Sequence, residues 1–132
     1  MSRLCLDTSA YSHFARGHSE VVAQIDQADW IGFPSITLGE LWLGFLLGQK
    51  LEENLETLSE FLAHPVVRCL NVDDETARLY AELVVDLRHA GAPLPTNDIW
   101  IAAAALQTRS TVLTFDRHFE RTERVPSRIL QG

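Results

Sequence analysis

The sequence lacks the long apolar run that a membrane-spanning helix requires, since no uninterrupted apolar stretch reaches about eighteen residues. Its first residues also lack the apolar core and small-residue cleavage site of a signal peptide. Cysteine is scarce, and neither Cys5 nor Cys69 has the CxxC spacing of a zinc or redox motif. Both lie in apolar, strand-like runs, so we expect two reduced core residues in a cytoplasmic protein.

Several catalytic motifs are absent as well. The chain has no glycine-rich phosphate loop and no G-x-S-x-G nucleophile turn, which argues against a phosphate-loop enzyme and a serine hydrolase. Its five histidines show no ligand spacing, and we expect them at the surface or at helix ends: His13, His18, His64, His89 and His118.

Basic residues are fewer than acidic ones, 11 against 18. The formal net charge is −7, which argues against binding of nucleic acid through bulk positive potential. The charge is uneven, however, because residues 109–132 hold five arginines against three acids. Arginine suits planar phosphate contacts, and Arg117, Arg121 and Arg124 are candidates for such contacts. For any single one of them, the alternative is a solvated surface.

Apolar runs and helical spacings alternate along the chain. We expect strands at residues 3–7, 30–33, 66–72, 111–115 and 125–130. Helices are expected at 8–16, from 19 onward, and at 36–47, 51–62, 73–90 and 97–107, with Ser35 as the cap of the helix at 36–47. Such alternation is typical of a mostly parallel sheet covered on both faces. The sequence therefore predicts one α/β domain over residues 1–132, with a four- to five-stranded sheet.

Three acidic residues recur where an apolar run ends or a helix begins. Asp7 and Asp116 close the runs at 4–6 and 111–115, and Asp98 opens the helix at 97–107. In a parallel α/β sheet such positions gather at the carboxyl edge, where ligands bind. Carboxylates held together repel one another unless a hard cation such as Mg²⁺ neutralises them. These residues predict metal-assisted phosphodiester chemistry. The alternative is a helix cap for Asp7, a first-turn acid for Asp98 and a turn residue for Asp116.

A fourth acid, Glu40, lies on a helix that is otherwise almost wholly apolar. With Thr37, Gly44 and Gly48 it forms a narrow stripe at helical spacing. A helix that is apolar elsewhere is usually buried or bound to a partner. Glu40 therefore faces either a metal or a buried arginine, and we favour the metal.

Four segments of the chain resemble, in order, the four motifs of PIN-domain ribonucleases, and more narrowly those of VapC-like toxins from bacterial toxin–antitoxin pairs. They are Leu6-Asp7-Thr8-Ser9, Ile36-Thr37-Leu38-Gly39-Glu40-Leu41, Asn97-Asp98-Ile99-Trp100-Ile101-Ala102-Ala103 and Leu113-Thr114-Phe115-Asp116-Arg117-His118-Phe119. Relatives often carry Asn where this chain has Ser9, a variation expected to leave the acidic set untouched.

This resemblance implies a three-layer PIN-like fold and an endoribonuclease that cleaves structured RNA with Mg²⁺ or Mn²⁺. Asp7, Glu40, Asp98 and Asp116 would hold one or two ions and so activate water for in-line attack on phosphorus. Around them, Thr8, Asn97 and Thr114 would orient carboxylates or substrate, with Asn97 supporting Asp98. Arg117, Arg121 and Arg124 become candidate RNA contacts.

The resemblance also implies a cognate antitoxin and a toxin homodimer. The run at residues 41–47 offers more apolar surface than one side of a sheet needs, so an antitoxin helix is expected to contact Trp42 and Phe45. The alternative is a helix packed on both sides within the domain.

Two readings from other classes remain open. One is a non-catalytic module that has kept the fold and binds RNA or a partner. The other is an aspartyl-phosphate phosphotransfer domain with Asp7 or Asp73 as the nucleophile. Against the second, Asp7 lacks an aspartate two residues on, and no strand ends in lysine.

Overall fold

Short apolar runs form the sheet in the structure, a computed structural model that describes residues 2–132. Its strands are β1 (Arg3–Leu6), β2 (Trp30–Pro34), β3 (Val67–Leu70), β4 (Thr111–Thr114) and β5 (Ser127–Ile129). They form a 5-stranded sheet in the order β3-β2-β1-β4-β5, and every neighbouring pair is parallel. The expected parallel sheet is confirmed, with β1 at its centre.

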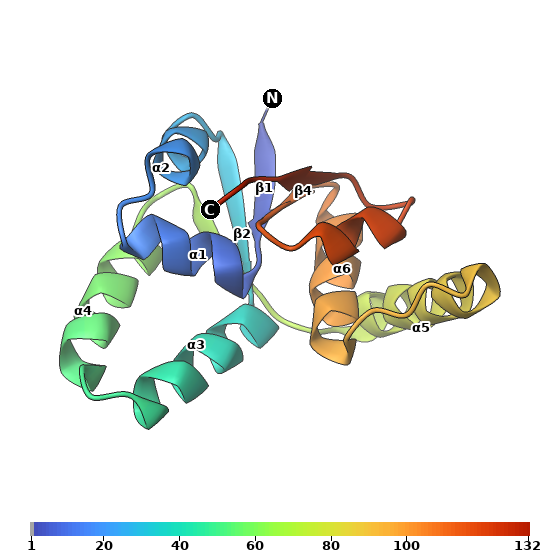
Figure 1. Ribbon diagram of the computed structural model, residues 1–132, viewed down its shortest axis with the longest axis horizontal. Helices are drawn as coiled ribbons and strands as arrows, with labels where there is room; N and C mark the ends of the chain where they lie inside the picture. The colour runs from blue at the N-terminus through green and yellow to red at the C-terminus, as the bar shows by residue number, and fades with distance from the viewer. Residues whose placement is uncertain (1) are drawn as a thin grey trace.

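The helices cover both faces of this sheet, as parallel strands require. One face carries α1 (Thr8–Ala15), α2 (Ser19–Asp26) and α4 (Leu51–Leu62), and the other carries α5 (Asp74–Ala90) and α6 (Thr96–Thr108) (Figure 1). Helix α3 (Ser35–Leu47) follows β2, and the 3₁₀ helix η1 (Arg117–Arg121) follows β4. Among residues 2–132, no helix is both long and apolar enough to span a membrane.

The pleat of the central strands separates two cores. Leu4 and Leu6 pack with residues of α1, α2 and α4, whereas Cys5 between them packs with α5 and α6. Neighbouring Val112 and Leu113 in β4 divide in the same way. Because β1 and β4 are buried on both faces, their inner residues, 4–6 and 112–113, are apolar without polar alternation.

Two expectations about side chains are wrong. Ser35 does not cap α3: the N-cap is Pro34, and the Ser35 hydroxyl donates to the Leu70 carbonyl of β3 at 3.0 Å. Cys69 is exposed, because its strand β3 forms the edge of the sheet. Both cysteines are free, and Cys5 is buried as expected, where burial raises the pKa of its thiol to about 12.

Candidate active site

Three of the four acidic residues lie at the carboxyl edge of the sheet or beside it, and the fourth is on α3. Asp7 directly follows β1, and Asp116 lies two residues beyond β4; these strands are parallel neighbours, so both side chains share one edge. Asp98 lies in the first turn of α6. Glu40 is half-buried on α3, the helix that leaves the same edge after β2.

The other three acidic residues all affect the pKa of Asp98. Its pKa is raised from the ordinary 3.8 to about 6, first by burial and then by the charges of Asp116, Asp7 and Glu40, while His118 acts in the opposite direction. A like charge raises a carboxyl pKa only when it is near. Asp116, Asp7 and Glu40 are therefore close enough to Asp98 to repel its charge.

Asp7 is held firmly in place and is 4% exposed. One oxygen, Oδ1, accepts from the Ala10 amide at 2.8 Å and from the Ser9 hydroxyl at 2.7 Å, and the other accepts from the Thr114 hydroxyl. Burial raises the pKa of Asp7, and these three hydrogen bonds oppose the rise. The helix-cap role considered for Asp7 is thus confirmed, and the same side chain also faces the acidic cluster.

Ser9 also belongs to this arrangement, a role that was not predicted for it from the sequence. Its hydroxyl donates to Asp7, accepts from the Phe115 amide at 3.0 Å and lies 3.4 Å from the Thr114 hydroxyl. It thereby joins the end of β1 to the end of β4. The Asp-x-Ser spacing before a helix was the available signal, because a hydroxyl two residues after a capping aspartate can reach its carboxylate.

Glu40 is bound by polar neighbours from two other elements. The Thr8 hydroxyl donates to its Oε1 at 2.6 Å, and the Asn97 amide donates to its Oε2 at 3.4 Å. Within residues 2–132 no arginine or lysine pairs with it, which leaves the buried-arginine alternative without support. Asn97 thus contacts Glu40, whereas we had expected it to support Asp98.

Asp116 begins the turn into η1. It accepts from the His118 amide at 2.9 Å, and its own amide donates to the Thr114 hydroxyl at 2.9 Å. The His118 imidazole Nδ1 lies 3.2 Å from Asp116 Oδ1. His118 was expected only at the surface; it is exposed, and it also borders the acidic cluster.

The chemistry of this donor set fits a hard divalent cation. Carboxylate oxygens are the ligands that Mg²⁺ and Mn²⁺ prefer, and a cation would relieve the repulsion that raises the pKa of Asp98. As the side chains stand in residues 2–132, no three His, Cys, Asp or Glu groups are close enough to share one ion. Loading would therefore require side-chain movement, and Glu40 and Asp98 are both only half-buried.

Adding Mn²⁺ to the metal-free protein is expected to raise its melting temperature by about 5 °C at pH 8 and to have little effect at pH 4.5. Asp98, whose pKa is about 6, is ionised at pH 8 and protonated at pH 4.5. Differential scanning calorimetry measures both values, with sodium chloride of equal ionic strength as the control. Equal stabilisation at the two pH values would place the cation elsewhere.

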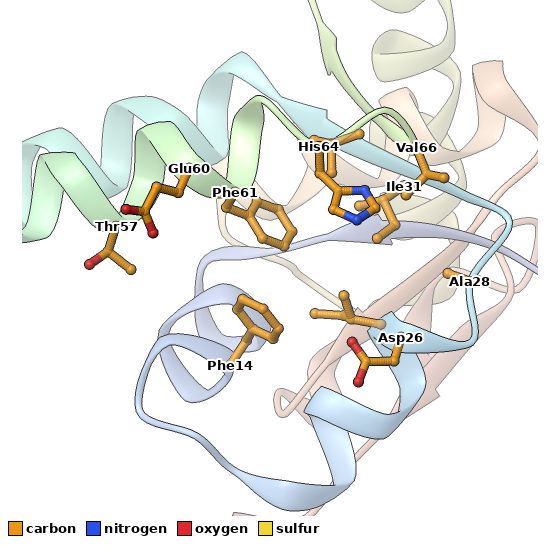
Figure 2. Close-up of a pocket in the computed structure, with 11 residues that line it drawn as sticks. Phe14, Asp26, Ala28, Ile31, Thr57, Glu60, Phe61, His64 and Val66 are labelled. Carbon is orange, nitrogen blue, oxygen red and sulfur yellow. The ribbon is translucent and has the colours of Figure 1, made fainter.

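A separate cavity of about 430 Å³ lies at the other edge of the sheet, beside the amino ends of β2 and β3. Phe14 and Phe61, whose ring centroids are 5.0 Å apart, line it together with Asp26 and Glu60 (Figure 2). None of the four clustered acids lines it. The acidic chemistry and this apolar cavity therefore belong to opposite edges of the sheet.

Comparison with known proteins identifies the fold. The family model of the PIN domain matches residues 4–125. The chain belongs to the PIN domain family. Ribonuclease VapC5 of Mycobacterium tuberculosis is 32% identical over 117 residues, which cover 86% of this chain and 83% of that protein. Ribonuclease VapC4 of the same organism is 35% identical over 91 residues, 69% of each chain.

Solved structures agree with this PIN-domain assignment. VapBC-5 of Mycobacterium tuberculosis, a member of the VapBC family of toxin–antitoxin systems, superposes with a TM-score of 0.75, 29% identity and coverage of 100% of both chains. VapBC2 of Rickettsia felis, bound to a DNA fragment from its promoter, gives a TM-score of 0.86 over 97% of this chain and 98% of that one. Its 22% identity supports the fold alone. The resemblance to PIN domains and VapC proteins is confirmed.

Proposed function

We propose that this PIN-domain protein is the endoribonuclease toxin of a toxin–antitoxin pair and that it requires Mg²⁺ or Mn²⁺. The observation that carries the proposal is the gathering of Asp7, Glu40, Asp98 and Asp116 at the carboxyl edge of the sheet, where the other three raise the pKa of Asp98. Relatives named as VapC ribonucleases support RNA as the substrate. Neighbours that are toxin–antitoxin complexes support a cognate antitoxin as the partner.

A bound divalent cation would stabilise negative charge on the phosphate and promote ionisation of an attacking water. The protein's own groups would prepare that site. Ser9 and Thr114 orient Asp7, which therefore needs little reordering on binding, and Thr8 holds one oxygen of Glu40. Asp98 would release its proton near pH 6 as the cation binds, which couples activity to pH.

The candidate RNA contacts differ in their availability. Arg124 pairs with Glu82 and Asp86 of α5, and Arg121 donates to the Pro93 carbonyl. Arg117 is 74% exposed, pairs only across 3.7 Å with a glutamate of its own 3₁₀ helix, and follows Asp116 directly. We expect Arg117 to supply the strongest phosphate contact, because a guanidinium already held in ion pairs must give them up to bind RNA.

A partner surface is supported on α3. Trp42, Leu43, Leu46 and Leu47 are all exposed, an unusual concentration of large apolar side chains on one helix. Phe45 is half-buried and packs against the core, so the helix uses one side for folding and leaves another free. The alternative of a helix packed on both sides is therefore disfavoured. The proposed partners are the cognate antitoxin, which would contact the exposed side of α3, and a second copy of the toxin.

The two alternative functions have less support. Asp7 is buried and its carboxylate already accepts three hydrogen bonds, which is unsuited to a covalent nucleophile. Asp73 caps α5 through Thr76 and is held by Gln107. A non-catalytic module would have no reason to hold four repelling carboxylates together, since they destabilise the metal-free fold.

Purified protein is expected to cleave structured RNA when Mg²⁺ or Mn²⁺ is present, and to leave it intact in EDTA. By family analogy the fragments should carry 5′-phosphate and 3′-hydroxyl ends, which ligation-based sequencing of the 5′ ends identifies. Re-addition of the cation after EDTA is the control for irreversible damage. Intact RNA under every cation condition would favour the non-catalytic module, and a phosphorylated aspartate would favour phosphotransfer.

A further inference from the structure

An aromatic cluster lies behind the acidic site, where the turn after β4 meets α1. The His13 imidazole stacks on the Phe115 ring with centroids 3.8 Å apart and planes 16° from parallel. The His18 ring meets both of them edge-on, at 5.6 Å from His13 and 5.1 Å from Phe115. Phe115 is the residue directly before Asp116, so this cluster fixes the backbone that carries one of the four carboxylates.

His13 also connects to the other strand end. Its Nδ1 lies 2.8 Å from the Ser9 carbonyl, and because a carbonyl only accepts, Nδ1 carries the proton. The hydroxyl of Ser9 in turn donates to Asp7 and accepts from the Phe115 amide. The His13 imidazole therefore contacts both residues that join the two strand ends. Its face packs on Phe115, and its N–H donates to the Ser9 carbonyl.

We propose that His13 is a positioning residue of the acidic site: its stacked ring sets the distance between Asp7 and Asp116. The inference rests on the proposed function, because it takes these two carboxylates as part of the cation site. His13 itself touches neither carboxylate. It acts through Phe115 and Ser9, and the stack is the main contact because it bears directly on the residue that precedes Asp116.

The two contacts of His13 can be separated by substitution. Phenylalanine keeps a planar ring on Phe115 and loses the N–H, whereas asparagine keeps a donor near the Ser9 carbonyl and loses the stack. If the stack positions Asp116, His13→Asn is expected to weaken Mn²⁺ binding about tenfold, a typical effect of losing a residue that supports a ligand. His13→Phe is expected to remain within about threefold of the wild type. The matched control is His64→Asn. His64 is exposed, follows the end of α4 and lies at the other edge of the sheet.

Calorimetric titration of the full chain with Mn²⁺, without RNA, measures these affinities. Amide NMR signals of Phe115 and Asp116 in the metal-free protein report the position of the turn; they are expected to shift in His13→Asn and to stay near wild type in His13→Phe. Saturating Mn²⁺ is expected to restore RNA cleavage by His13→Asn to within about twofold of the wild-type rate, because a misplaced ligand weakens binding more than chemistry.

Wild-type Mn²⁺ affinity in His13→Asn would overturn the proposal, and so would equal weakening in the Asn and Phe variants. Should His13→Asn fail to fold, wild-type affinity and amide positions in His13→Phe support the stack, and their loss contradicts it. Failure of the proposed function gives a different result: the wild type itself would neither bind Mn²⁺ nor cleave RNA, and His13 would then have no cation site to position.

Discussion

Replacing Asp98 by asparagine is expected to lower RNA cleavage by at least about 100-fold and, at the same time, to stabilise the metal-free protein. Cleavage falls because the variant loses one of the four carboxylates proposed to hold the cation. Stability rises because Asp98 is ionised against burial and three neighbouring negative charges, which is why its pKa is raised to about 6. A neutral amide of the same shape removes that cost.

The raised pKa of Asp98 also determines how stability changes with pH and over which pH range. The folded pKa of about 6 lies above the ordinary 3.8, so the folded state binds this proton more tightly than the unfolded chain does. Wild-type stability therefore falls as the pH rises from about 4 to about 6, and stays lower above that range. Asp98→Asn is expected to melt about 3–5 °C higher than wild type at pH 8, and at nearly the same temperature at pH 4.

The matched control is Asp26→Asn, which changes an exposed aspartate at the opposite edge of the sheet. That variant is expected to cleave RNA at the wild-type rate. Fluorescently labelled RNA gives the rates, and calorimetry in EDTA gives the melting temperatures. Wild-type cleavage by Asp98→Asn in Mg²⁺ would rule out the assigned site, and a lower melting temperature at pH 8 would rule out the repulsion on which the assignment rests.

Trp42→Ala is expected to weaken the complex with the antitoxin by about 30-fold, with little change in the stability of the toxin alone. The Trp42 side chain is 44% exposed on α3, which also carries three exposed leucines, so Trp42 contributes little to the core of the toxin. Tryptophan anchors near the centre of an interface commonly account for about 2 kcal/mol or more each. The acidic toxin, with a net charge of −7, should also bind a basic antitoxin more tightly at low salt.

Val85→Ala provides the comparison, because Val85 is 49% exposed on α5 and its loss should leave the affinity unchanged. Titration of wild type and both variants at low and high Mg²⁺ separates the α3 contact from any antitoxin group that competes for the acidic site. Equal affinity of wild type and Trp42→Ala in all conditions would move the antitoxin to another surface. A change in the size of the toxin alone, seen by light scattering, would instead assign Trp42 to the toxin dimer.

Local signals in the sequence predicted most of the elements because the interactions that form them are short in range. The helix at 51–62 was located from its apolar spacing alone, and the ends of α5 follow from the Asp73 cap and from Gly91 at a left-handed φ of 63°. Parallel pairing was also predictable, since strands joined by helices have no other simple connection. The exposure of Cys69 was not predictable in this way: the residue lies in a strand-like segment, and the place of β3 at the edge of the sheet leaves it exposed.

The sequence by itself determined that Asp7 and Asp116 share the carboxyl edge of the sheet, because a residue that follows a parallel strand has only one edge to occupy. The tertiary structure alone decided which groups orient them. Ser9 and Phe115 are 106 positions apart, and Asn97 and Glu40 are 57 apart. The ion pairs of Arg124 with Glu82 and Asp86 of α5 are a third example. Contacts of this kind depend on the angle and distance at which packed elements meet, and those are set by the whole core, which no local stretch of sequence encodes.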